Sequence, residues 1–313
     1  MKKKKLYKSY KNGYLKVSDG YKIYYELYGN PRGKPVIFVH GGPGGGFSKE
    51  DKRFFNPKIF NVILFDQRGS GKSKPFASLK ANTTAKLVQD MKKLLEFLGI
   101  KKIFLFGGSW GSTLSLVYAI KHPETISGIL LRGIFLGTDK EIRYSYNGGV
   151  KRFFPEIWER FISNVPGKYR KNPVSYYLKK MKSKNPKVKE KYTFEWAYYE
   201  MSLLKLKSNQ EEIKRELKRY SYKSLAPIEA HYFKNHCFLP DNYILKNAYK
   251  LSKIPISIIQ GRYDFVCPPI NAYKLHKKLK NSKLHFVFAG HSSSEKEIEK
   301  KLISEMNRFS KII

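Results

Sequence analysis

The feature that most constrains the fold is a series of short, continuous apolar runs separated by amphipathic stretches. The runs lie at residues 35–40, 60–66, 102–106, 126–131, 254–260 and 284–288. Apolar runs of this length, bounded by glycine or polar turns, are typical of parallel strands that are buried on both faces. A looser alternation at 21–28 indicates an antiparallel strand.

The stretches between the runs have the apolar spacing of helices. Residues 83–98, 110–121, 271–279 and 295–309 repeat apolar side chains every three or four positions. Strands that alternate with helices predict an α/β fold with a mostly parallel central sheet and helices on both faces.

This pattern is interrupted between residues 137 and 251. The interrupting stretch is rich in Lys, Tyr, Phe and Trp, and it contains none of the buried-strand runs. We therefore expect one α/β domain in two parts, 1–136 and 252–313, with a helical cap domain inserted at 137–251.

A candidate nucleophile lies between a predicted strand and a predicted helix. Residues 107–111 read GGSWG, which matches G-x-S-x-G. In a sharp strand-to-helix turn the central serine is exposed, and side chains two residues away would collide. An ordinary glycine-rich turn can have the same sequence, but the position of the motif predicts that Ser109 is a nucleophile.

A glycine-rich loop follows another predicted strand, with the sequence HGGPGGG at residues 40–46. Acyl transfer places negative charge on the substrate carbonyl oxygen, and two backbone N–H groups can stabilise it. We expect these groups at Gly42 and at Trp110, the residue after the nucleophile. A phosphate-binding loop is the weaker alternative, because the G-K-[ST] ending and the G-x-G-x-x-G spacing are missing.

The acid and the base follow the serine in the chain order of this class of triad. Asp264 lies in GRYDFVCPP just beyond one predicted strand, and His291 lies in AGHSSSE just beyond another. Both are expected at the carboxyl edge of the sheet, where active sites of parallel sheets form. His291 would take the proton of Ser109, and Asp264 would orient the imidazole.

These motifs together resemble the proline iminopeptidase (prolyl aminopeptidase) family of serine peptidases, which have an α/β-hydrolase fold. The resemblance extends from about residue 10 to the end and is carried by HGGPGGG, DQRGSGKS at 66–73, residues 82–100 and 107–124, LRGIF at 131–135, GRYDFVCPP and GHSSSE. It implies release of N-terminal proline from peptides through an acyl-enzyme intermediate, with neither a metal nor a cofactor.

The resemblance also implies a site for the charged amine of the substrate. Two cap glutamates bind this amine in the family, and the matching positions are Glu200 in WAYYE and Glu229 in PIEAHYF. A buried ammonium needs carboxylate partners, because leaving it unpaired is energetically costly. The positions that match the family's apolar proline pocket are Phe135, Phe233 and Cys267.

The composition limits the partners of the protein. With 62 Lys and Arg against 25 Asp and Glu, the formal net charge is +37. The basic residues are scattered and form no recognisable nucleic-acid motif, so we interpret the charge as a composition bias and expect no specific nucleic-acid binding. The sequence leaves the oligomeric state open.

The sequence also predicts a cytoplasmic protein. No window approaches the roughly 18 apolar residues of a membrane helix, so we expect no membrane partner. The basic residues 1–5 are not followed by the apolar stretch of a signal peptide. The two cysteines, Cys237 and Cys267, cannot form a disulfide framework, which fits a reducing compartment.

The nearest alternative is an esterase of the same fold that acts on small acyl esters. Such an enzyme would share the triad and the oxyanion loop but would have no use for Glu200 and Glu229. Hydrolases of this fold with an aspartate nucleophile are disfavoured by Ser109. A non-catalytic binding protein is disfavoured by the complete set of catalytic residues.

Overall fold

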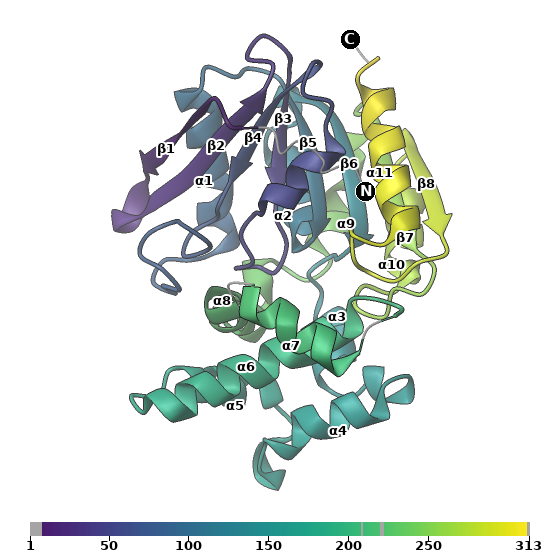
Figure 1. The fold of residues 1–313 in the computed structure, drawn as a ribbon. Helices are drawn as coiled ribbons and strands as arrows, with labels where there is room; N and C mark the ends of the chain where they lie inside the picture. Colours follow the sequence, from purple (N-terminus) through teal and green to yellow (C-terminus); the bar gives the residue numbers. More distant parts are fainter. Residues whose placement is uncertain (1–7, 208, 220–221, 312–313) are drawn as a thin grey trace.

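The fold is built around an eight-stranded sheet in the order β1-β2-β4-β3-β5-β6-β7-β8 (Figure 1). The structure, a computed structural model, describes residues 8–207, 209–219 and 222–311, so the basic residues 1–5 lie outside the described part. β1 and β2 pair antiparallel, as do β2 and β4. The remaining neighbours pair in parallel. The mostly parallel sheet predicted from the apolar runs is confirmed.

Each of the six predicted apolar runs overlaps one of the strands β3 to β8. The strands are β1 (Lys11–Lys16), β2 (Lys22–Gly29), β3 (Lys34–Val39), β4 (Phe60–Phe65), β5 (Ile103–Ser109), β6 (Ile126–Ile134), β7 (Ile256–Gly261) and β8 (Ser282–Val287). The predicted antiparallel strand corresponds to β2. The edge strand β1 was not predicted, because its sequence KNGYLK is too polar to form an apolar run.

Successive residues of the central strands pack on opposite faces of the sheet, as the period of two in a strand requires. Ile37 and Leu105 belong to the apolar core on one face, which includes side chains of α1, α2 and α10. Phe38 and Phe106 belong to the core on the other face, which includes α11. These helices are α1 (Thr84–Phe97), α2 (Trp110–Lys121), α10 (Pro269–Lys278) and α11 (Lys296–Phe309).

A helical cap lies between β6 and β7 in the chain and below the sheet in Figure 1. We use "cap" for the helices α3 (Asp139–Tyr146), α4 (Pro155–Ser163), α5 (Pro173–Met181), α6 (Pro186–Leu203), α7 (Gln210–Arg219) and α8 (Tyr222–Lys234). The short helix α9 (Tyr243–Asn247) leads back to the sheet. The predicted helical insertion is therefore present, whereas the domain limits at 136/137 and 251/252 stay a prediction.

Aromatic rings form much of the cap interior, which explains the Tyr- and Trp-rich sequence of this segment. The rings of Phe161 and Tyr177 stack at 4.4 Å and 3°, and those of Tyr146 and Trp196 at 4.5 Å and 13°. Stacked and edge-on aromatic pairs stabilise a core beyond the burial of their area. The cap therefore has a rigid aromatic interior on which functional side chains can be held.

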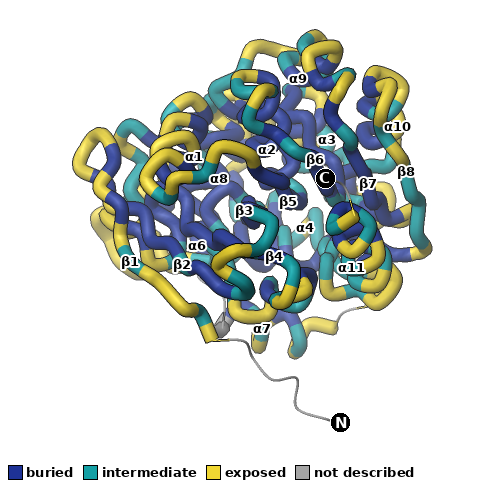
Figure 2. Tube along the Cα trace, turned by 90° about the horizontal axis from the view of Figure 1, so that it is seen from above, coloured by how far each residue is buried: buried dark blue, intermediate teal, exposed yellow. Residues whose placement is uncertain are grey.

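The burial of the chain follows this layered arrangement. In Figure 2 the strands at the centre are mostly buried, while exposed residues gather in the outer loops and helix surfaces. Within the described ranges, no helix has both the length and the apolar character needed to cross a membrane.

Candidate active site

Ser109 stands at the sharp turn between β5 and α2. It is the last residue of β5, and its backbone has φ 58° and ψ −128°, a conformation that non-glycine residues rarely adopt. A Cβ on Gly107 would lie 2.2 Å from the carbonyl oxygen of Gly111, and a Cβ on Gly111 would lie 2.0 Å from that of Val39. The glycines of the motif are therefore required by the close approach of the backbone around the serine.

The glycine-rich loop after β3 lies against this turn. A Cβ on Gly41 would lie 3.4 Å from the Cβ of Ser109, and Gly42 lines the same cavity as Ser109. Gln67 fixes the loop to the start of α2, because its Nε2 donates to His40 O at 2.9 Å and its Oε1 accepts from the Trp110 indole at 3.0 Å. This arrangement places the backbone of Gly42 and the helix start at Trp110 next to the serine, as an oxyanion site requires.

Asp264 and His291 meet at the carboxyl edge of the sheet. His291 Nδ1 lies 2.8 Å from Asp264 Oδ2, and both residues are buried. Backbone N–H groups of Val266 and Cys267 donate to Asp264 Oδ1 at 3.0 and 2.8 Å, and Gln260 Nε2 donates to Oδ2 at 3.0 Å. The carboxylate is thereby held in one orientation toward the imidazole.

The other ring nitrogen of His291 faces Arg132 of β6. Arg132 Nη1 lies 2.9 Å from His291 Nε2 and donates to His291 O at 2.9 Å. Burial lowers the pKa of His291, the negative charge of Asp264 opposes this, and the positive charge of Arg132 lowers it further. The imidazole is therefore held neutral, the state in which it can accept a proton.

A small cavity of about 30 Å³ brings together most of the residues that the sequence singled out. The predicted residues that line it are Gly42, Ser109, Phe135, Glu200, Glu229, Phe233 and Cys267. This volume has room for about two water molecules.

Glu200 of α6 and Glu229 of α8 bring two carboxyl groups into this cavity from the cap. Trp196, one helical turn before Glu200, donates from Nε1 to Glu229 Oε2 at 2.7 Å. Glu200 Oε2 is buried and has no hydrogen-bond partner within the part of the chain that the structure describes. The two carboxyl groups can therefore accept hydrogen bonds from a cationic group that enters the cavity.

The two carboxyl groups also affect each other's ionisation. Burial raises the pKa of Glu200 above its ordinary value. It raises the pKa of Glu229 well above that value, and the nearby charge of Glu200 raises it further. Two buried like charges without a cation between them are unfavourable, and a bound ammonium would relieve both effects.

The predicted apolar residues form one wall of the cavity. The rings of Phe135 and Phe233 lie 5.8 Å apart, edge to face. Burial raises the pKa of the Cys267 thiol well above its usual value, while a hydrogen bond with Ser109 acts in the opposite direction. The thiol therefore stands beside the candidate nucleophile as an uncharged group.

Several lining residues were not singled out from the sequence. They are Ser145, Tyr146, Tyr199, Leu203 and Val266. Tyr146 and Tyr199 come from helix faces whose apolar spacing is the same as that of ordinary core residues, so the sequence carries no separate signal for them. Arg132 lies within the LRGIF segment, but its partner His291 is 159 residues away in the chain. Within the described residues, no group of three or more His, Cys, Asp or Glu side chains is placed to hold a metal ion.

Comparison with known proteins gives two kinds of match. The alpha/beta hydrolase fold family matches residues 34–297. A proline iminopeptidase of Arabidopsis thaliana is 43% identical over 298 residues, which cover 94% of this chain and 78% of the relative. A proline iminopeptidase of Neisseria meningitidis serogroup A is 43% identical over 282 residues, which cover 90% of each chain.

Solved structures with a similar fold include esterases at low sequence identity. An esterase from Exiguobacterium antarcticum matches with a TM-score of 0.65 and 19% identity, covering 95% of this chain and 98% of the esterase. An esterase from Thermogutta terrifontis matches with a TM-score of 0.66 and 18% identity, covering 96% and 97%. These similarities confirm the predicted fold class.

Proposed function

Because this chain belongs to the proline iminopeptidase family of α/β hydrolases, we propose that it is a serine aminopeptidase that releases N-terminal proline from peptides. The membership confirms the resemblance that the sequence motifs indicated. The observation that carries the proposal is the presence of Glu200 and Glu229 in the same buried cavity as Ser109.

The covalent geometry of an amino-terminal residue explains why these groups must share a cavity. Its amine nitrogen and its carbonyl carbon are joined through one Cα and lie about 2.5 Å apart. The oxygen of a serine that attacks this carbonyl therefore lies within a few ångströms of the ammonium. The buried carboxylates of Glu200 and Glu229 supply the negative charge that a desolvated ammonium requires.

In the first half of the proposed reaction, Ser109 Oγ attacks the carbonyl carbon of the proline while His291 Nε2 accepts the hydroxyl proton. The oxyanion that forms is stabilised by the backbone N–H groups of Gly42 and Trp110. As the peptide bond breaks, the imidazolium returns the proton to the leaving amine. A prolyl ester of Ser109 remains, and the shortened peptide departs with a free amino end.

In the second half, water attacks the prolyl ester and His291 accepts one of its protons. The tetrahedral intermediate breaks down with return of that proton to Ser109 Oγ, and free proline leaves. Asp264 stabilises the imidazolium in both halves. Because Arg132 Nη1 lies 2.9 Å from His291 Nε2, this contact must open before Ser109 can transfer its proton to that nitrogen.

An esterase acting on small acyl esters is the alternative within the same fold. Esters without an amine gain nothing from two buried carboxyl groups, which are unfavourable side by side unless a cation lies between them. Substitution of Glu229 by Gln separates the two functions. We expect kcat/KM for proline anilide to fall about 10²- to 10³-fold, the effect of removing one partner of a buried charge pair, while hydrolysis of an acetate ester is retained.

Glu190→Gln is the matched control, because Glu190 is exposed on the same helix as Glu200. This control should leave both activities unchanged. Equal loss of ester and anilide hydrolysis in Glu229→Gln would indicate a structural defect, and unchanged anilide hydrolysis would remove Glu229 from the amine site.

A further inference from the structure

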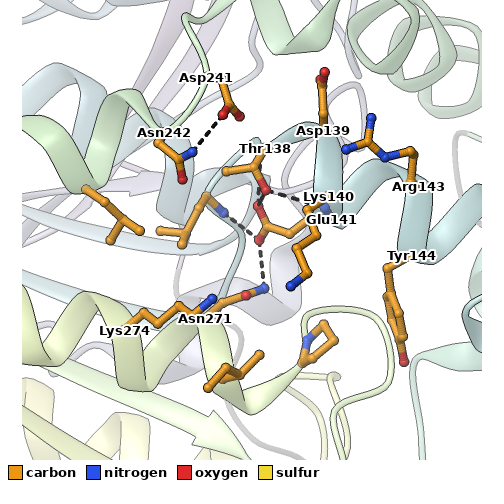
Figure 3. A pocket seen from close by; sticks show the side chains of 14 residues that line it. Thr138, Asp139, Lys140, Glu141, Arg143, Tyr144, Asp241, Asn242, Asn271 and Lys274 are labelled. Atoms are coloured by element: carbon orange, nitrogen blue, oxygen red, sulfur yellow. Dashed lines mark hydrogen bonds between the residues drawn. The ribbon is translucent and has the colours of Figure 1, made fainter.

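A second and larger cavity lies beside the candidate active site, with a volume of about 730 Å³ (Figure 3). It is formed by the beginning of α3, by the segment around α9 and by the first half of α10. We call it the α3–α10 groove. Its volume is in the range of sites that hold ligands of several residues or a small molecule. The catalytic steps above make no use of it.

Neighbouring residues of the chain line the groove and the catalytic cavity. Phe135 lines the catalytic cavity and the next residue, Leu136, lines the groove. Cys267 and Pro268 are divided between the two cavities in the same way. A peptide held at Ser109 by its proline therefore has its following residues close to the groove, since two or three extended residues span about 7–10 Å.

The groove lies near the Asp264–His291 pair of the candidate active site. Tyr144 lines it, and the pKa of this phenol is raised by burial and by the charge of nearby Asp264. Asp264 holds His291, which delivers the proton to the leaving amine.

Three basic side chains line the groove, and Lys274 lies near enough to Glu141 to lower the pKa of that carboxyl, which burial raises. They are Lys140 and Arg143 of α3 and Lys274 of α10. None of them has an ion-pair partner within the residues that the structure describes. Figure 3 shows the side chains of Lys140 and Lys274 extending toward the middle of the groove from its two sides.

The acidic side chains of the groove are held by other groups. Glu141 is buried and accepts hydrogen bonds from Leu136 N, Thr138 N, Thr138 Oγ1 and Asn271 Nδ2 at 2.7–2.9 Å. Asp139 contacts the imidazole of His236, and Asp241 accepts from Asn242. In Figure 3 Asp139 and Asp241 lie at the upper edge of the groove, away from the lysine nitrogens.

We propose that the α3–α10 groove binds a carboxylate of the leaving peptide, so that the enzyme prefers substrates with a negative charge one to three residues after the N-terminal proline. The carboxylate is an Asp or Glu side chain or the free C-terminus of a short peptide. This inference rests on the proposed function, because it assigns the groove to the same substrate. The net charge of +37 attracts anionic peptides from solution, and the groove adds a fixed position for their charge.

The test compares matched peptides that differ only in one charge. Pro-Glu-amide and Pro-Ala-Glu-amide are each compared with the Gln form, and Pro-Ala-Gln as free acid is compared with its amide. We expect kcat/KM to be roughly threefold to tenfold higher for the anionic member, the effect of one or two partly exposed ion pairs. The Glu and Gln peptides test a side-chain carboxylate, and the acid and amide forms of Pro-Ala-Gln test the free C-terminus.

Three double variants locate the effect, and the two Gln variants among them change the net charge equally. Lys140→Gln with Lys274→Gln should bring the ratio of kcat/KM for the anionic substrate to kcat/KM for the neutral one close to one. Lys140→Glu with Lys274→Glu should favour cationic substrates. Lys277→Gln with Lys278→Gln, at the exposed end of α10, should keep the wild-type ratio.

Within each variant, the ratio of the two kcat/KM values does not depend on how much of the protein is folded, because both values scale with the same amount of active enzyme. Equal ratios in the groove and control variants, or no charge preference in the wild type, would overturn the groove assignment. Hydrolysis of proline anilide by the wild type tests the proposed function separately, because this substrate has no peptide to place in the groove.

Discussion

His291 Nε2 lies 2.9 Å from Arg132 Nη1, and the same guanidinium nitrogen donates to His291 O at 2.9 Å. An Nε2 that accepts a hydrogen bond leaves the ring proton on Nδ1, which then donates to Asp264. This is the tautomer that a general base requires. We infer that Arg132 is a positioning residue, which holds His291 in this tautomer.

The pH dependence of hydrolysis tests this inference. Burial and the charge of Arg132 both lower the pKa of His291, so the acid limb of ester hydrolysis should lie below pH 6.5. Loss of the charge in Arg132→Met should raise that pKa and move the limb to higher pH, whereas Arg132→Lys should move it less. An ester is used because it has no amine to titrate together with Glu200 and Glu229. An unmoved limb in Arg132→Met would contradict the positioning role.

The buried glutamate pair should reduce the stability of the substrate-free protein. The pKa of Glu229 in the folded state is raised well above its unfolded value of about 4.5. The folded state therefore binds the proton more tightly, and the free energy of unfolding falls as pH rises above that unfolded value toward the folded one. We expect Glu229→Gln to be more stable than wild type by about 1–2 kcal/mol at pH 8, with a smaller difference at pH 5.

Urea unfolding of both proteins at several pH values measures this difference. A Glu229→Gln variant that is less stable at every pH would show that the carboxyl group stabilises the fold and is not held under strain for the substrate.

The sheet could be predicted, and the candidate triad proposed, because their signals are local. Continuous apolar runs mark strands that are buried on both faces, and the glycines around Ser109 are required by backbone contacts only a few residues away. Asp264 and His291 follow strand ends, where chain order and position together identify them. The exposed edge strand β1 gave no such signal.

The cap residues were harder to predict because tertiary packing determines their role. Glu200 and Tyr199 are neighbours on α6 and both line the cavity, but only the family resemblance pointed to the glutamate. The hydrogen bond from Trp196 to Glu229 joins two helices, and no periodicity within either helix predicts it. The α3–α10 groove is likewise formed by α3 together with segments about 100 or more residues later in the chain.

Bulky thiol reagents should inhibit the enzyme through Cys267, although the mechanism uses a serine. A modified Cys267 would fill the wall beside Ser109, and the raised pKa of the thiol predicts slow labelling that becomes faster with increasing pH. Cys267→Ala should resist inhibition. Cys237→Ala should remain sensitive, because Cys237 is buried but does not line the catalytic cavity. Full activity after complete labelling of Cys267, shown by mass spectrometry, would place the thiol outside the substrate site.

Hydrolysis of a chromogenic panel by the wild type and by Ser109→Ala tests the central claim most directly. The panel contains free-amine proline anilide, N-acetylated proline anilide, alanine and leucine anilides, and an acetate ester. We expect strong cleavage of free-amine proline anilide, little cleavage of its acetylated form, and loss of activity in Ser109→Ala. Cleavage of the ester with free-amine proline anilide left intact would contradict this expectation, and the assignment of Glu200 and Glu229 to the substrate amine would be withdrawn.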